Sequence, residues 1–188
     1  MGRAPIDAET IYSYVGNGAP ALISRVLGKG ATKSQVDRAL EFFLHYYNTH
    51  LLDQTTLYPG AKEALRKLAN GTSSPERTMA ILTNKPVYPS QLIIDGLGLA
   101  DLFPIVYGGN SFGTKKPDPH GLNRILKETR VEASAAMMVG DSDVDIQTGV
   151  NAGSWTCGIT HGFGNLDVHN NPPDLVVDTL LELAAHLE

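Results

Sequence analysis

The sequence has few of the features that mark secreted, membrane or nucleic-acid-binding proteins. Its single cysteine, Cys157, excludes an internal disulfide and a CxxC metal site. Fifteen basic residues against 20 acidic ones give a net charge of −5, which argues against non-specific nucleic-acid binding. The sequence has no apolar run approaching the ~20 residues that span a bilayer, and it begins without the apolar stretch of a secretory signal. We therefore expect a cytoplasmic protein with no membrane or nucleic-acid partner.

What is present is typical of a globular protein. The 188 residues suffice for one domain, or for a core with a small accessory unit, and 42% of them are hydrophobic. The sequence shows neither low complexity nor a repeat of fixed period. The number of subunits is not indicated by any of these features.

Residues 1–57 are predicted to be helical, with no strand. Thr32 followed by Gln35 fits a capping box at the start of a long helix. Apolar residues then recur at helical spacing and form one stripe, made of Val36, Leu40, Phe43, Leu44, Tyr47 and Leu51. We expect this region to form a small α-helical unit distinct from residues 58–188.

From residue 58 onward, short apolar runs alternate with helical patterns. The predicted strands lie within 78–84, 104–109, 136–141, 154–160 and 174–177, and the predicted helices follow residues 60, 88, 118, 143 and 178. This alternation predicts βαβ units, and hence a Rossmann-like α/β core with a parallel sheet. Strands covered by helices on both faces are apolar on both faces, as these runs are.

Polar residues follow several of the predicted strands. Ligands of open parallel sheets bind beyond the carboxyl ends of the strands, so these residues are candidates for a site. They are Thr83, Asn84, Lys115, Lys116, Asp141, Asp143, Asp145, Thr160 and His161.

Together these residue types suit a magnesium ion and a phosphate. Carboxylates without a Cys or His cluster favour Mg²⁺, which protein carboxylates and substrate phosphates usually hold together. A threonine hydroxyl and backbone amides at a strand-to-helix turn can bind phosphate oxygens, and a lysine supplies positive charge.

Each residue also has a simpler explanation. Asp143 or Asp145 could cap a helix, the lysines could be solvated, and Thr83 could belong to an ordinary turn. Asn17 and Gly18 could be loop residues, and His161 a structural histidine. Cys157 lies within an apolar strand and is interpreted as core packing. The order of the polar residues, and their common edge, favour a site over these separate explanations.

Three stretches resemble motifs of the haloacid dehalogenase (HAD) superfamily of hydrolases. "ILTNKP" is similar to the second motif, "KKPDP" to the third and "VGDSDVD" to the fourth. "YVGNGAPALISRVL" and "LYPGAKEAL" further resemble phosphoglycolate phosphatases, whose helical cap is inserted after the first core strand. The resemblance covers essentially the whole chain. It implies a HAD-like core at 58–188 and part of an α-helical cap at 1–57.

The resemblance also implies roles for individual residues. Thr83 and Lys116 would act in catalysis and bind the phosphoryl group, and Asp141 and Asp145 would bind Mg²⁺. Asn84, Asn17 and Gly18 would also contact the substrate, a small phosphorylated metabolite with phosphoglycolate as the first choice. The family mechanism proceeds through an aspartyl-phosphate intermediate.

One family motif has no counterpart in the sequence. The first HAD motif is an apolar strand followed by Asp-x-Asp-Gly-Thr, and its first aspartate is the nucleophile. Asp7, Asp37 and Asp53 are isolated and follow no apolar strand. Family order places the motif upstream of "DAETIYSYVGNGAP", and a mean strand, a turn and a mean helix would amount to roughly 25–30 absent residues. Without it we expect a gap in the sheet near Ile81 and Val139, and an inactive chain.

Three functions therefore remain open at this stage. The first is a Mg²⁺-dependent phosphomonoester hydrolase, with phosphoglycolate as substrate. The second is a non-catalytic phosphate-ligand-binding or regulatory protein that lost the nucleophile. The third, within the superfamily, is another small-molecule phosphatase, a phosphomutase or a dehalogenase.

Overall fold

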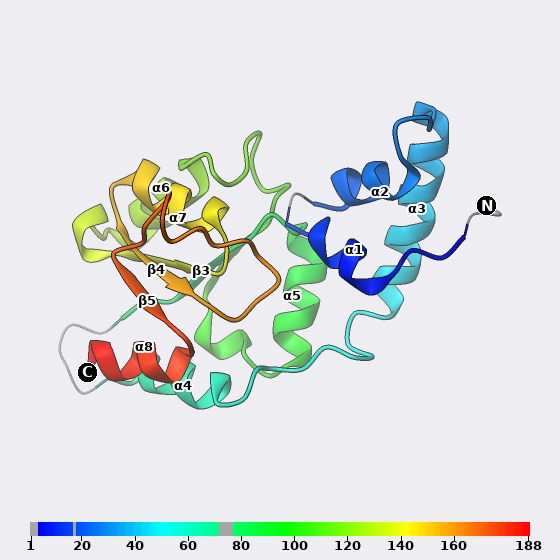
Figure 1. The fold of residues 1–188 in the computed structure, drawn as a ribbon. Helices are drawn as coiled ribbons and strands as arrows, with labels where there is room; N and C mark the ends of the chain where they lie inside the picture. Colours follow the sequence, from blue (N-terminus) through cyan, green and yellow to red (C-terminus); the bar gives the residue numbers. More distant parts are fainter. Residues whose placement is uncertain (1–3, 17, 72–76) are drawn as a thin grey trace.

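The N-terminal region of the computed structural model is helical, as predicted. The structure describes residues 4–16, 18–71 and 77–188. Within the described residues up to 57 there is no strand, and the helices are α1 (Ala8–Ser13), α2 (Ala19–Leu27) and α3 (Lys33–Thr49). These helices gather at one end of the molecule, beside α5 and away from β4 and β5 (Figure 1).

Local interactions explain where two of these helices begin. The predicted capping box at α3 is present: the Thr32 hydroxyl accepts a hydrogen bond from the Gln35 amide, and the Gln35 side chain accepts one from the Thr32 amide. Asp7 caps α1, because its carboxylate accepts hydrogen bonds from the Thr10 amide and hydroxyl. Asp7 is therefore occupied as a helix cap.

The apolar stripe of α3 faces inward, as its spacing predicts. Its members within the helix are half-buried and Leu51, just beyond the helix, is buried, whereas Phe42 and Tyr46 on the other side are exposed. The stripe packs against α2, which buries Ile23 and Leu27.

The rest of the chain alternates strands and helices, which confirms the α/β class. The strands are β1 (Ala80–Leu82), β2 (Ile105–Tyr107), β3 (Met137–Gly140), β4 (Trp155–Ile159) and β5 (Leu175–Val177). The helices are α4 (Ala61–Ala69), α5 (Val87–Gly96), α6 (His120–Thr129), α7 (Asp143–Ala152) and α8 (Leu180–Leu187), with 3₁₀ turns η1 (Ala100–Leu102) and η2 (Ala133–Ala135).

The strands form two parallel sheets. β1 pairs with β2, with Ile81 opposite Val106, and β3, β4 and β5 pair in that order, with Val139 opposite Cys157. α6 contacts β1, α7 contacts β3 and β4, and α6 packs on α7, so one helical layer covers both sheets. α4 and α8 lie together on the opposite face (Figure 1).

The two sheets meet without a ladder between β1 and β3. Each of these strands has one edge paired, β1 with β2 and β3 with β4. Ile81 and Val139 are only half-buried, although each lies in the middle of its strand. The break in hydrogen bonding thus falls where the sequence predicts a gap in the sheet.

One hydrophobic core cluster lies between the larger sheet and α8. Cys157, Val177 and Leu183 are at most 1% exposed and belong to one cluster. Burial raises the pKa of the Cys157 thiol to about 11, so the residue stays neutral and serves packing. No helix in the described part of the chain is long and apolar enough to cross a bilayer.

Candidate active site at the carboxyl edge of the strands

A buried ion pair joins two of the predicted site residues. Lys116 lies in the loop before α6, and Asp145 lies in the first turn of α7. The Lys116 Nζ atom is 2.5 Å from Asp145 Oδ1, and the two side chains are only 11% and 7% exposed. The Ser142 hydroxyl donates to the other oxygen, Asp145 Oδ2, at 2.6 Å. Asp145 therefore holds the ammonium of Lys116 in a fixed position.

Gly140 makes this position accessible to the Asp145 side chain. A Cβ atom on Gly140 would lie 2.2 Å from Asp145 Cγ, so any larger residue at the end of β3 would displace the carboxylate. The close approach of the Asp145 side chain thus explains why a glycine occupies this position of "VGDSDVD".

Asp141, directly after β3, is fixed by the loop that follows β4. Its Oδ2 atom accepts hydrogen bonds from the amides of Phe163 and Gly164, both at 3.0 Å. Gly164 must be small, because a Cβ there would lie 2.4 Å from the Asp141 carbonyl oxygen. The Asp143 carboxylate has a different partner, since its Oδ1 atom accepts a hydrogen bond from the Asp167 amide at 2.8 Å.

Thr83 and Asn84 lie at the end of β1. The Thr83 amide donates to the Tyr107 carbonyl, which extends the pairing with β2, and its hydroxyl accepts from the Lys85 amide at 3.1 Å. Asn84 Nδ2 donates to the Lys116 carbonyl at 3.1 Å and so connects the loops after β1 and before α6. Its Oδ1 atom is buried and has no hydrogen-bond partner among the described residues.

The loop before α2 borders the same edge. Of the two predicted residues there, Asn17 lies outside the described residues. Gly18 has a φ of 87°, and its Cβ position lies 3.8 Å from the Asn84 carbonyl oxygen and 3.9 Å from Lys115 Nζ. Asn84 Nδ2 also approaches the Gly16 carbonyl at 3.5 Å. The structure thus brings Gly18 next to Asn84. The two predicted lysines differ: Lys115 is exposed, whereas Lys116 is held by a carboxylate.

Further contacts connect the N-terminal helices to this edge, and the sequence reasoning did not identify them. The Lys85 ammonium donates to the Tyr47 hydroxyl of α3 and lies 4.5 Å from the centre of that ring. Tyr12 of α1 contacts Phe163, with ring centroids 5.2 Å apart. Lys85 directly follows Asn84 in the sequence, and that position was the available signal.

The contacts of His161 indicate a structural role rather than a catalytic one. Its ring nitrogen Nδ1 is hydrogen-bonded to the Asp178 carbonyl, and its ring lies 4.4 Å from that of Tyr58. The neighbouring Thr160 hydroxyl donates to Asp178 Oδ1 at 2.5 Å. These contacts fasten the start of the loop after β4 to the chain after β5.

The donors at this edge fit a magnesium ion held by one protein carboxylate. Asp141 keeps one oxygen, Oδ1, without a hydrogen-bond partner in the described part of the chain. Both oxygens of Asp145 are engaged by Lys116 and Ser142, so direct coordination there would require breaking one of these bonds. Among residues 4–16, 18–71 and 77–188, no cluster of three or more His, Cys, Asp or Glu side chains is placed to hold a metal. Mg²⁺ typically completes its shell with water and substrate phosphate.

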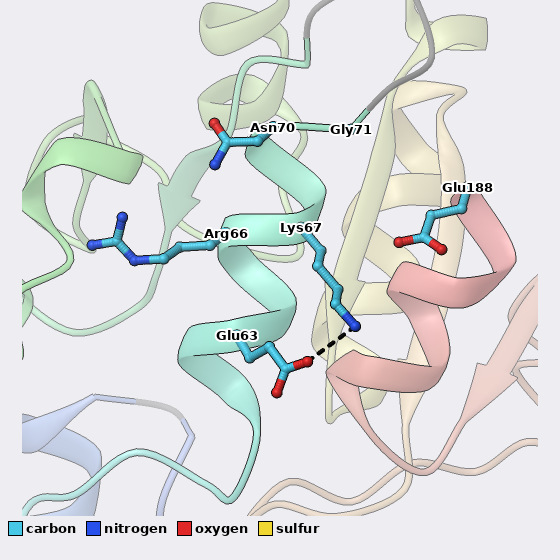
Figure 2. A pocket seen from close by; sticks show the side chains of 6 residues that line it. All are labelled: Glu63, Arg66, Lys67, Asn70, Gly71 and Glu188. Atoms are coloured by element: carbon cyan, nitrogen blue, oxygen red, sulfur yellow. Dashed lines mark ion pairs between the residues drawn. The ribbon is translucent and has the colours of Figure 1, made fainter.

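A cavity of about 400 Å³ lies elsewhere, between the C-terminal ends of α4 and α8. Figure 2 shows its lining, where Lys67 forms an ion pair with Glu63 at 3.0 Å. Helices of βαβ units run antiparallel to their strands, so these helix ends lie at the amino edge of the sheet. The cavity is therefore separate from Thr83, Lys116 and Asp141.

Fold and site together define a Rossmann-like α/β protein with a polar site at the carboxyl edge of its strands. The chain belongs to the haloacid dehalogenase-like hydrolases, since the model of that family matches residues 2–159. It is 36% identical to a phosphoglycolate phosphatase of Vibrio parahaemolyticus, over 97% of this chain and 82% of that protein. It is 34% identical to the phosphoglycolate phosphatase of Colwellia psychrerythraea, over 100% of this chain and 84% of that protein.

A solved structure shows the same fold. The crystal structure of a predicted phosphoglycolate phosphatase from Haemophilus somnus superimposes with a TM-score of 0.89 at 26% identity. The match covers 100% of this chain and 85% of that one. The family and the HAD-like fold that the sequence resemblance implies are therefore confirmed.

Proposed function

We propose that this protein is the cap and most of the core of a Mg²⁺-dependent phosphomonoester hydrolase acting on phosphoglycolate. The observation that carries the proposal is the buried Lys116–Asp145 pair. Asn84 donates to the Lys116 carbonyl, and Thr83, which directly precedes Asn84, is hydrogen-bonded within the same turn. A fixed, desolvated ammonium at the carboxyl edge of parallel strands suits a phosphoryl group that becomes more negative in the transition state.

Each site residue has a distinct part in this proposal. Lys116 and the Thr83 hydroxyl bind phosphoryl oxygens and stabilise their charge, and Asn84 orients the loop that carries Lys116. Asp141 holds Mg²⁺, which when bound neutralises phosphate charge. Asp145 keeps Lys116 in place; its assignment as a direct metal ligand remains a prediction.

The nucleophile belongs to a further strand between β1 and β3. The family's first motif places an aspartate at the end of such a strand, and no described residue does so here. Both edges facing the break belong to parallel strands, and α6 and α7 cover the region from one face. A parallel strand inserted there would end beside Thr83, Lys116 and Asp141, at the position from which a carboxylate attacks the phosphoryl group.

Phosphoglycolate is the substrate for two reasons. The relatives with 34–36% identity are phosphoglycolate phosphatases by name. The loop before α2 also resembles theirs, and Gly18 in it lies against Asn84. The N-terminal helices would act as a cap that closes over the substrate, excludes water and selects small phosphorylated compounds.

The proposal is tested on the chain extended upstream in its reading frame. A panel of phosphomonoesters should show a preference for 2-phosphoglycolate, and Lys116→Ala should lower turnover by about two orders of magnitude, since one such interaction is worth about 3 kcal/mol. Lys127→Ala, at an exposed position of α6, is the matched control. A tenfold preference for a sugar phosphate or nucleotide would overturn the substrate, and unchanged turnover in Lys116→Ala would overturn the site.

A non-catalytic phosphate-binding protein is the second candidate. The specific observation in its favour is that Asp7 caps α1 and no described aspartate stands where a nucleophile would. Binding of inorganic phosphate by the 188-residue chain, with no hydrolysis gained when the chain is extended upstream, would establish this candidate.

A further inference from the structure

Two half-buried lysines border the end of β1: Lys85 is hydrogen-bonded to Thr83, and the Lys116 carbonyl accepts from Asn84. Their ammonium groups differ in whether an acidic residue pairs with them. Lys116 is paired with Asp145. Lys85 forms no salt bridge with any described residue, and its ammonium is hydrogen-bonded to the neutral hydroxyl of Tyr47. An ammonium has three donors, so at least two of those on Lys85 remain for other acceptors.

A partly desolvated ammonium without a counter-charge is unfavourable unless an anion joins it. The environment of Lys85 therefore favours binding of a negatively charged group. The Tyr47 hydroxyl can donate to the same group, because it both accepts and donates hydrogen bonds. Lys85 comes from the core and Tyr47 from α3, so the anion would lie where the N-terminal helices meet the core.

The position of Lys85 relative to the phosphate site fixes which anion fits. Its amide donates to the Thr83 hydroxyl at 3.1 Å, and its side chain extends from there to α3. A ligand with phosphate at Thr83 and Lys116 would thus meet Lys85 with its distal end. In 2-phosphoglycolate an ester oxygen and a single methylene group separate the phosphate from a carboxylate, which is a second anion at short range.

We propose that Lys85, assisted by the Tyr47 hydroxyl, binds the distal carboxylate of a short phosphorylated acid and so determines substrate specificity. The inference rests on the proposed function, because it assumes phosphate at Thr83 and Lys116. It adds a residue that discriminates between acidic and neutral phosphate esters.

The experiment compares two ligands that differ in this carboxylate. Binding of 2-phosphoglycolate and of ethyl phosphate to the 188-residue chain is followed by protein-observed NMR titration in the presence of Mg²⁺. Lys85→Met should weaken binding of 2-phosphoglycolate about tenfold or more, since a hydrogen bond between charged groups is lost. Binding of ethyl phosphate should stay within about twofold on the same reasoning. Lys29→Met, which removes an exposed charge, is the matched control.

Tyr47→Phe separates carboxylate binding from a purely mechanical contact. This substitution keeps the ring beneath Lys85 and removes the hydroxyl, so it should weaken binding of 2-phosphoglycolate less than Lys85→Met does. If both variants weaken both ligands equally, or if Lys85→Met changes neither, the inference is overturned. The inference, but not the proposed function, is also overturned if the unaltered chain binds ethyl phosphate as tightly as 2-phosphoglycolate. If the unaltered chain binds neither ligand, the inference is overturned, whereas the proposed function is tested separately by hydrolysis of 2-phosphoglycolate by the upstream-extended chain.

Discussion

The ammonium of Lys116 and the carboxylate of Asp145 meet at 2.5 Å although the residues are 29 positions apart in the chain. Both side chains are largely withdrawn from solvent, so each needs the other. Ser142 satisfies the second carboxylate oxygen, which completes the hydrogen bonding of Asp145. The pair therefore couples the loop before α6 to the start of α7.

We predict that Asp145→Asn destabilises the protein by about 3–5 kcal/mol, because it leaves a buried ammonium without its counter-charge. The measurement is urea unfolding followed by circular dichroism. Glu63→Gln is the control, since it breaks the Lys67 ion pair on the exposed surface of α4 and should leave the unfolding midpoint unchanged. Equal midpoints for Asp145→Asn and the unaltered protein would mean that the Lys116 ammonium is solvated.

A second prediction concerns the metal. Hydrolysis by the upstream-extended protein should require Mg²⁺, and Asp141→Asn should remove most of the activity, because it removes the negative charge from the carboxylate with a free oxygen. Mg²⁺ binding measured by calorimetry should weaken at least tenfold on the same grounds. Asp143→Asn is a close control: it lies two residues away, yet its carboxylate accepts from the Asp167 amide. Full activity of the unaltered protein in excess chelator would contradict the metal assignment.

The connection between β4 and β5 makes stability depend on acid pH. Asp174 accepts hydrogen bonds from the Thr156 hydroxyl at 2.7 Å and the Thr156 amide at 2.8 Å. These bonds hold the pKa of Asp174 below its ordinary value of 3.8. A carboxyl group with a lowered pKa contributes stability that is present above the ordinary value and is lost as the pH falls through the folded value.

Asp174→Asn should therefore flatten the dependence of the unfolding midpoint on pH between about pH 5 and pH 2. Asp95→Asn, at an exposed position of α5, should keep the slope of the unaltered protein. The comparison is made by thermal unfolding across that range. Parallel curves for Asp174→Asn and the unaltered protein would show that the Thr156 contact does not bias the titration.

Local features of the fold were predictable because they depend on neighbours in the sequence. The Thr32–Gln35 capping box and the apolar stripe of α3 were both read correctly, and the alternation of strands and helices gave the α/β class. Residues directly after strands, such as Thr83 and Asp141, are expected at one edge because parallel strands end together, and their joint role in a site stays a prediction.

Contacts between distant segments were not predictable in the same way. The family resemblance implies a metal-binding role for Asp145, which stays a prediction, but it gives no indication that the Asp145 carboxylate also contacts Lys116 and Ser142. Lys85 received no role, because its relation to Tyr47 depends on how α3 packs against the core. Side-chain partners across such distances follow from tertiary packing, which a single sequence does not specify.

The last prediction concerns the break between β1 and β3. The 188-residue chain should not hydrolyse 2-phosphoglycolate, because phosphate-ester hydrolysis needs accelerations that a site without its nucleophile does not supply. Adding the upstream segment should supply both the nucleophile and a strand that buries Ile81 and Val139. Each apolar side chain so buried contributes about 1.5–3 kcal/mol, and about 1 kcal/mol shifts Tm by roughly 2–4 °C at this size. The extended protein should therefore melt about 6 °C higher or more and hydrolyse the ester. A variant of the extended protein with the nucleophilic aspartate changed to asparagine should keep the higher Tm and lose the activity. This variant separates the structural role of the strand from its catalytic role.

Cooperative melting of the short chain at the same temperature as the extended one, with an in-frame stop codon directly upstream of Met1, would contradict the missing strand and favour the non-catalytic phosphate-binding protein.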